Sequence, residues 1–202
     1  MIPIFCRDKA TERPTSQAVG IGATDIPIAD ASSYFAAGER VFISESDATE
    51  VEYLGTIRAA DSDSITVEFA TAAAKGAGAK VWTPDKVFEW PAGEDARAKR
   101  IRHSGVEVVR SLGGVAYATR LALPYEVEEV AFESLTDGRR AQLEDFFDEA
   151  ADGGLDAFTY VDAARGVWRV RLDAPVLEWG RTARGLLAVE FRLQLLEGAL
   201  YA

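Results

Sequence analysis

The run from Leu187 to Leu195 alternates apolar and polar residues without a break, and this pattern constrains the fold more than any other. Its apolar positions are Leu187, Val189, Phe191, Leu193 and Leu195. Its other positions are Ala188, Glu190, Arg192 and Gln194. Successive side chains of a strand point to opposite sides of a sheet, so this period indicates a half-buried β-strand. A strand of this length is expected near the centre of a sheet, or extending past it to pair with another subunit.

The segment from Thr24 to Thr83 carries the same signal in shorter runs separated by turn residues. Four or five small strands fit there, with apolar positions at Ile26, Ile28, Val41, Ile43, Val51, Tyr53, Ile65, Val67, Phe69, Val81 and Trp82. The small residues at 72–78 are expected to form a loop. We therefore predict an amino-terminal arm over 1–15 and a small, barrel-like β module over 16–84, inserted or peripheral to the rest.

Residues 85–202 have larger aromatic residues and longer predicted strands. The expected strands are Val106–Arg110, Val115–Leu121, Glu126–Phe132, Phe158–Asp162, Val167–Leu172, Val176–Trp179 and Leu187–Leu195. Gly113 and Gly114 suit a tight reversal between the first two, because paired glycines accept the positive φ of hairpin turns. The turn at residues 163–166 separates two further strands.

One amphipathic helix is predicted at about residues 135–151. Thr136 or Ser134 can cap its first amides, and the glycines at 153 and 154 end it. Its apolar positions are Leu143, Phe146, Phe147 and Ala150, and its polar face includes Arg139, Arg140, Glu144, Asp145, Asp148 and Glu149. Such a helix is expected to lie on a sheet. The predicted fold class is mainly β, sandwich- or barrel-like, with one helix packed on the second sheet, and α+β by strict count.

The charge balance argues against nucleic-acid binding by the chain as a whole. The formal net charge is −11, and acidic residues outnumber basic ones both before and after Pro84. Attraction to phosphates needs a positive surface. The one candidate patch is the basic segment 97–103, with Arg97, Lys99, Arg100, Arg102 and His103. We interpret it as a solvated face or a partner contact, since no aromatic residues interleave it.

Few residues suit catalysis or metal binding. Cys6 is the single cysteine and His103 the single histidine, so neither a disulfide within the chain nor a zinc cluster is expected. His103 lies among basic residues that disfavour a neutral base, and Cys6 is interpreted as a small apolar filler. The start of the chain lacks the apolar core of a secretory peptide, and no apolar stretch reaches membrane-spanning length, so we expect folding in a cytoplasm.

The remaining candidate motifs have simpler structural interpretations. The adjacent pairs Glu128–Glu129 and Asp148–Glu149 point apart and favour solvated surface over a glycosidase dyad. Gly20–Thr24 is interpreted as a turn, because a phosphate loop would need a following GKS or GKT. Asp61, Asp63 and Ser64 form a polar turn without the full ligand set of a calcium loop. Five aromatic residues favour a core or an interface over a carbohydrate platform: Trp82, Phe88, Trp90, Trp168 and Trp179. No catalytic, metal or cofactor site is predicted.

The order of elements from about Val87 to Leu196 resembles the distal tail protein family of long-tailed bacteriophages. The resemblance rests on a hairpin-rich sheet, a helix opened by Phe132–Asp137 and ended by Leu143–Phe147, then Phe158–Asp162, Val167–Leu172 and Leu187–Leu193. Other tail-tube and tail-tip proteins share a related core. The small β module before Pro84 departs from the simplest family pattern.

The resemblance implies a virion structural protein with no enzymatic activity, assembled in the host cytoplasm. Copies would form a ring at the tail tip, in the baseplate, as a homohexamer that joins the tail-tube protein to the hub or receptor-binding apparatus. DNA would pass through its mildly acidic lumen without specific binding. Ring closure would also order the amino-terminal arm, Ile2 to Pro14, which is expected to order only against a neighbour.

Two alternatives remain open at this stage. The chain could carry a carbohydrate-binding β module of a tail or baseplate, or it could be another tail-tube or tail-completion protein. An enzyme would have to be built around His103, and this is the least favoured class.

Overall fold

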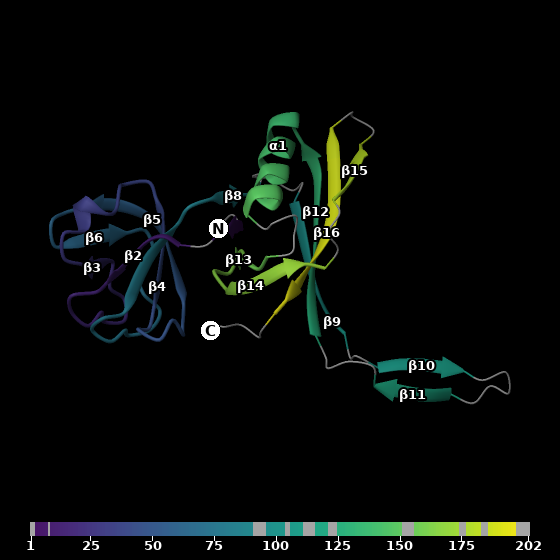
Figure 1. The fold of residues 1–202 in the computed structure, drawn as a ribbon, viewed down its shortest axis with the longest axis horizontal. Helices are drawn as coiled ribbons and strands as arrows, with labels where there is room; N and C mark the ends of the chain where they lie inside the picture. Colours follow the sequence, from purple (N-terminus) through teal and green to yellow (C-terminus); the bar gives the residue numbers. More distant parts are fainter. Residues whose placement is uncertain are drawn as a thin grey trace. The chain divides into compact units, whose positions relative to one another are not determined.

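The computed structural model describes residues 3–7, 9–90, 96–103, 106–110, 116–120, 125–150, 156–173, 177–182 and 186–196, with backbone alone at 96, 103, 106–110, 116–120 and 150. The described chain is mainly β, with antiparallel pairing throughout and one α-helix, which confirms the predicted fold class (Figure 1). By internal contacts it divides into two compact units. The first contains described parts of 1–90 and 158–169, and the second those of 91–157 and 170–196.

Six strands of the first unit form one sheet in the order β2-β7-β4-β5-β6-β3. Their bounds are β2 Lys9–Pro14, β3 Asp25–Pro27, β4 Arg40–Ser44, β5 Glu52–Ala60, β6 Ser64–Val67 and β7 Lys80–Pro84, and a 3-10 turn covers Ala31–Ser33. The predicted strands of the module all have counterparts in this sheet. Its core is a cluster of buried aliphatic side chains that includes Ile26, Val41, Ile43, Ile65 and Val81.

Gly55 interrupts β5 where the pairing with β4 shifts register. Its φ is +81°, and a Cβ at this position would come within 2.8 Å of Glu68 Cβ and Phe69 Cδ2. Only glycine combines this backbone conformation with so close an approach, so the bulge depends on Gly55.

The amino-terminal segment pairs within its own chain. Strand β1 (Ile4–Cys6) lies between β8 (Val87–Glu89) and β13 (Phe158–Val161), and β2 pairs with β7. All three residues of β1 are buried. The expectation that this arm orders only against a neighbour is therefore wrong. A strand that is buried on both faces shows no alternation of apolar and polar residues, and three residues are too few to reveal it in another way.

The larger sheet has the strand order β8-β1-β13-β14-β16-β12-β9, with β15 also paired to β16. Strand β14 (Val167–Leu172) begins in the first unit and ends in the second. The second unit further contains β9 (Ala96–His103), β12 (Tyr125–Leu135), β15 (Glu178–Arg181) and β16 (Leu187–Leu195). The five predicted apolar positions of β16 are all buried, and it pairs with three strands, so its predicted central place is confirmed.

The predicted helix is present as α1 (Asp137–Asp145), followed by a π-helical turn over Phe146–Ala150. Thr136 is its N-cap and accepts a hydrogen bond from the Arg139 amide. Leu143, Phe146 and Phe147 are buried. The Phe147 ring lies 5.3 Å from the Phe191 ring of β16, so the helix packs on the sheet as expected. The predicted stop at 152–154 lies outside the described residues.

Strands β10 (Val106–Arg110) and β11 (Ala116–Arg120) pair with each other as a separate two-stranded ribbon (Figure 1). They confirm the two strands predicted there, while the glycine reversal between them lies outside the described residues. Strands β9 and β12, which precede and follow the ribbon in the chain, pair along eight residues up to His103 opposite Tyr125.

Strands β1, β2, β8 and β9 were not predicted from the sequence. Strand β9 occupies the basic segment, whose charged residues leave no apolar alternation from which a strand could be predicted. Arg97, Lys99, Arg100 and Arg102 are exposed, which agrees with the interpretation of the segment as a solvated face or a partner contact. Strand β15 begins at Glu178, and the predicted start at Val176 lies outside the described residues. In the described part of the chain, no helix is long and apolar enough to span a membrane.

Candidate functional site

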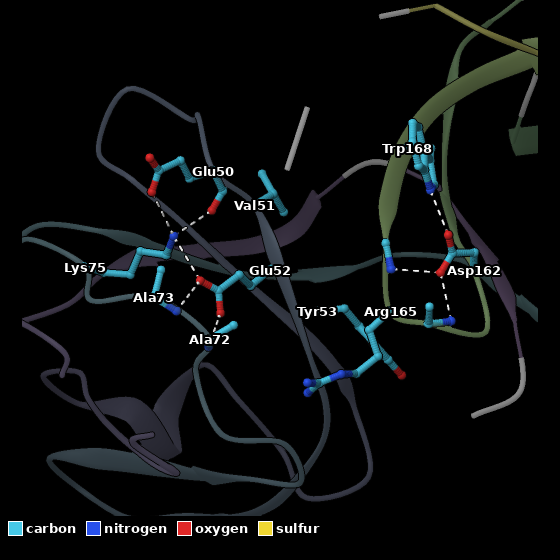
Figure 2. Close-up of a pocket in the computed structure, with 12 residues that line it drawn as sticks. Glu50, Val51, Glu52, Tyr53, Ala72, Ala73, Lys75, Asp162, Arg165 and Trp168 are labelled. Carbon is cyan, nitrogen blue, oxygen red and sulfur yellow. Dashed lines mark hydrogen bonds and ion pairs between the residues drawn. The ribbon is translucent and has the colours of Figure 1, made fainter. Parts of the chain in front are cut away.

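A cavity of about 510 Å³ opens in the first unit between two loop regions (Figure 2). One wall consists of residues 50–53 with Ala72, Ala73 and Lys75. The other consists of Asp162, the turn at 164–166 and Trp168. Both walls belong to the same compact unit.

Lys75 and Glu52 anchor the first wall. The Lys75 side chain has no solvent exposure, and its Nζ lies 3.0 Å from Glu52 Oε1. It also donates to the Glu50 carbonyl oxygen at 2.8 Å and lies 3.4 Å from Glu50 Oε2. An ammonium group has three protons, so these acceptors can satisfy all of them. A buried cation is tolerated here because it is paired and hydrogen-bonded.

Glu52 holds the loop that carries Lys75. Its carboxylate accepts the backbone amides of Ala72 at 2.7 Å and Ala73 at 3.1 Å. Lys75 itself makes an isolated β-bridge with Val19. The segment 72–78 is a loop, as predicted, and the Lys75 side chain within it is buried, which was not predicted. A lone lysine among alanines and glycines was the available sequence signal.

Asp162 organises the second wall in a similar way. Its Oδ1 accepts the amides of Ala164 and Gly166 at 2.9 and 2.8 Å, and its Oδ2 accepts Trp168 Nε1 at 3.0 Å. A Cβ at Gly166 would lie 2.7 Å from Asp162 Oδ2. Glycine is therefore needed for the carboxylate to fold over the turn. Figure 2 shows this carboxylate between its three donors.

Each wall holds one residue in the left-handed region. Glu50 has φ +48° and Arg165 has φ +73°. Non-glycine residues in this region are uncommon and concentrate at functional sites. The Arg165 guanidinium lies over the Phe69 ring at 5.1 Å, and the Glu50 side chain is 62% exposed.

Burial controls the ionisation of the groups next to the first wall. Burial raises the pKa of Tyr53, a cavity residue, to about 12. Burial also raises the pKa of the Cys6 thiol well above its usual range, so the thiol stays protonated. A protonated, fully buried thiol is a poor nucleophile, which agrees with the interpretation of Cys6 as an apolar filler.

The other sequence candidates are separated in the structure. His103 lies at the end of β9 in the second unit and Cys6 in β1 of the first, and the His103 side chain is outside the described atoms. No cluster of three or more His, Cys, Asp or Glu side chains that could hold a metal occurs among the described residues. Asp61 and Asp63 lie in an exposed turn, as predicted, and Gly20 precedes a turn.

The Glu128–Glu129 pair is not simply solvated surface. Glu128 is buried and accepts from Arg100 Nε at 2.8 Å, while Glu129 accepts from Arg192 Nε at 3.0 Å. The two carboxylates bind arginines of different neighbouring strands, β9 and β16, because adjacent residues point to opposite faces. Asp148 and Glu149 are exposed, as predicted.

The basic segment forms the edge strand of the larger sheet. In the β9–β12 register, Lys99 faces Glu129, Arg100 faces Glu128 and Arg102 faces Glu126. Arg97 also forms an ion pair with Glu133. Acidic side chains of β12 thus match the basic strand. The outer edge of β9 has no paired strand among the described residues.

Most of the candidate aromatic platform is core. Trp82, Phe88 and Trp90 are buried, and the Trp82 ring stacks on Phe42 at 4.2 Å. Trp168 is half-buried at the cavity, and Trp179 is half-buried with the Arg140 guanidinium over its ring.

The fold and the site define a mainly β protein of antiparallel sheets, with an open edge strand, a separate ribbon and a cavity between two anchored loops. A scan against models of known protein families and a search of curated proteins each returned no match to this chain.

Proposed function

We propose that this chain is a non-enzymatic structural subunit of a phage tail tip, whose copies form a ring, as a homohexamer, between the tail tube and the hub or receptor-binding apparatus. The observation that carries the proposal is that two parts of the described fold have strand edges open for pairing. The β9 edge and the β10–β11 ribbon have no further strand partner among the described residues.

Unpaired strand edges are strong sites for pairing with another chain. A two-stranded ribbon is also marginally stable alone in water, so it gains from a partner. The four arginine and lysine residues of β9 disfavour pairing with a second β9, because like charges would face each other. Head-to-tail contact between different surfaces is then favoured, and a contact of this kind generates rings when its rotation closes.

The order of elements gives further support. The sequence resemblance to distal tail proteins depended on a strand, a helix and three following strands. These are β12, α1, β13, β14 and β16 in the structure. A net charge of −11 also suits a passage through which DNA moves without being held.

The oligomeric state tests the proposal. We expect purified full-length protein to form a closed ring, hexameric by light scattering and visible as a ring in negative-stain images. A monomer at high concentration would overturn the proposal. Binding to separately purified tail-tube and hub proteins of the same phage would distinguish a tip ring from a tube or completion protein.

A ribbon-deleted variant locates the contact. Because His103 and Tyr125 face each other, residues 104–124 can be replaced by a two-residue Asn-Gly turn that closes β9 onto β12. We expect this variant to keep its fold by circular dichroism and to lose the ring. A matched control inserts Asn-Gly after Gly113 and should keep the ring. Assembly that is unchanged in the deleted variant would show that the ribbon is not the contact.

A carbohydrate-binding module receives less support. Trp82 and Trp90, its main aromatic candidates, are buried in the first unit. A glycan that changed their fluorescence would favour this alternative.

A further inference from the structure

The cavity between the two anchored loops has the features of a built ligand site. Its volume of about 510 Å³ lies within the usual range for small-ligand pockets. Each wall is held by a carboxylate with three donors, Glu52 on one side and Asp162 on the other. A site held in this way is preorganised, so a ligand would not have to order it.

Two charged groups remain available after these internal bonds are counted. Lys75 has three acceptors, and the carboxylates of Glu52 and Asp162 are engaged. Lys75 is shared between two carboxylates, Glu50 and Glu52, so this wall keeps one net negative charge. Glu50 is the more exposed of the two acids, at 62% against 17%. Arg165 is exposed, and no described carboxylate pairs with it. The cavity therefore has one exposed acid on one wall, Glu50, and one exposed base on the other, Arg165. Its remaining charged residues, Glu52, Lys75 and Asp162, are held by internal bonds.

The backbone at both groups is strained. Glu50 and Arg165 are two of only four non-glycine residues with positive φ among the described residues, and both line this cavity. The Arg165 guanidinium lies over the Phe69 ring, 5.1 Å from its centroid, a cation–π contact that uses none of its N–H donors.

The surface between the two charges is mainly apolar. Val51, Tyr53 and Trp168 contribute to it, together with the methyl groups of alanines on both walls. A plain anion would be attracted by Arg165 but repelled by Glu50, and a plain cation would meet the reverse. A ligand with both charges and a small apolar body matches the whole cavity.

We propose that this cavity binds a small zwitterion of the amino-acid or short-peptide class, with its ammonium group on Glu50 and its carboxylate on Arg165. A bidentate carboxylate–guanidinium pair would fix one end of the ligand. This proposal is independent of the ring, because both charged residues belong to one chain.

The probes are alanine, dialanine, trialanine and tetraalanine, titrated into the full-length protein by calorimetry and tryptophan fluorescence. We expect saturable binding of at least one length. For that length, acetylation of the amino end should weaken binding at least tenfold, and amidation of the carboxyl end should do the same. These comparisons use the unaltered protein and do not depend on the folding of any variant.

Two substitutions test which residue binds the amino end of the peptide and which binds its carboxyl end. In Glu50→Gln the free and acetylated peptides should bind equally, and in Arg165→Gln the acid and the amide should bind equally. Exposed residues of the same unit outside the cavity provide matched controls, Asp61→Asn and Arg58→Gln, which should behave as the unaltered protein.

The proposal is overturned if none of the four probes binds saturably. It is also overturned if blocked peptides bind as tightly as free ones. A third contrary result would be the loss of both end effects in Arg58→Gln or Asp61→Asn, because the charges at 50 and 165 would then not be responsible.

Discussion

Lys75 Nζ and Glu52 Oε1 lie 3.0 Å apart, and the Lys75 side chain has no exposed surface while that of Glu52 retains 17%. The pair joins the loop before β7 to the start of β5 and forms the inner part of one cavity wall. Its burial makes it sensitive to the loss of either partner.

We expect Lys75→Met to lower the free energy of unfolding by about 3 kcal/mol, because a nearly buried Glu52 carboxylate would lose its cation. Urea denaturation measures this loss. The double variant Lys75→Met/Glu52→Gln should recover part of it, since a neutral amide needs no counter-charge. Lys80→Met is the matched control, because Lys80 is 35% exposed and lies 3.8 Å from Glu12. Equal losses at the two lysines would contradict this account of the pair.

Gly55→Ala should destabilise the module by about 3 kcal/mol, since it combines a left-handed backbone with a Cβ placed 2.8 Å from Glu68 Cβ and Phe69 Cδ2. Thermal or urea unfolding provides the measurement. Gly78→Ala is the control, because Gly78 has φ +83° with no atom within 4 Å of the added Cβ. Its cost should be about 1 kcal/mol. A Gly55→Ala cost no larger than that of Gly78→Ala would argue against the close contact.

Thr136→Ala should cost about 1 kcal/mol, because the Thr136 hydroxyl accepts the Arg139 amide at 3.3 Å as the helix N-cap. Ser134 was the other candidate cap in the sequence, and Ser134→Ala should be nearly neutral. Urea midpoints of the two variants give the comparison. If Ser134→Ala were the more destabilising variant, Ser134 and not Thr136 would be the N-cap of the helix.

Asp162→Ala should cost about 2 kcal/mol, because three donors lose their acceptor. Asp162→Asn should cost less. Its oxygen can still accept the two turn amides, while its amide group faces the Trp168 indole N–H. Both variants should alter Trp168 fluorescence in the folded state. Asp156→Ala is the control, because Asp156 is exposed. If Asp162→Asn and Asp162→Ala were equally destabilising, the two turn amides could not account for the difference expected between them.

The protein should lose stability in alkali partly through Tyr53. Its pKa is raised by burial from about 10 in the unfolded chain to about 12 in the folded state. The unfolded chain therefore releases this proton first, so the contribution is intact below pH 10 and falls as pH rises towards 12. Urea midpoints between pH 9 and 12 should fall less steeply for Tyr53→Phe. Cys6 contributes equally to both proteins, and parallel curves would refute the assignment to Tyr53.

The periodic parts of the fold could be predicted from the sequence. Strand β16 and the helix follow directly from Leu187–Leu195 and from the spacing of Leu143, Phe146 and Phe147, because each pattern specifies which side chains must leave water. Strand β9 could not be predicted in this way. Its basic residues are matched by glutamates on β12, and this match exists only after the two strands pair.

By itself the sequence determined the mainly β class, the helix α1, and the buried face of β16. These features depend on the spacing of apolar residues along the chain, which can be read directly from the sequence. Only the tertiary structure decided that β1 is buried between β8 and β13, and that Glu50 and Lys75 lie across a cavity from Asp162 and Arg165. Residues more than eighty positions apart form that site through chain topology, and no local pattern records which distant loops will meet.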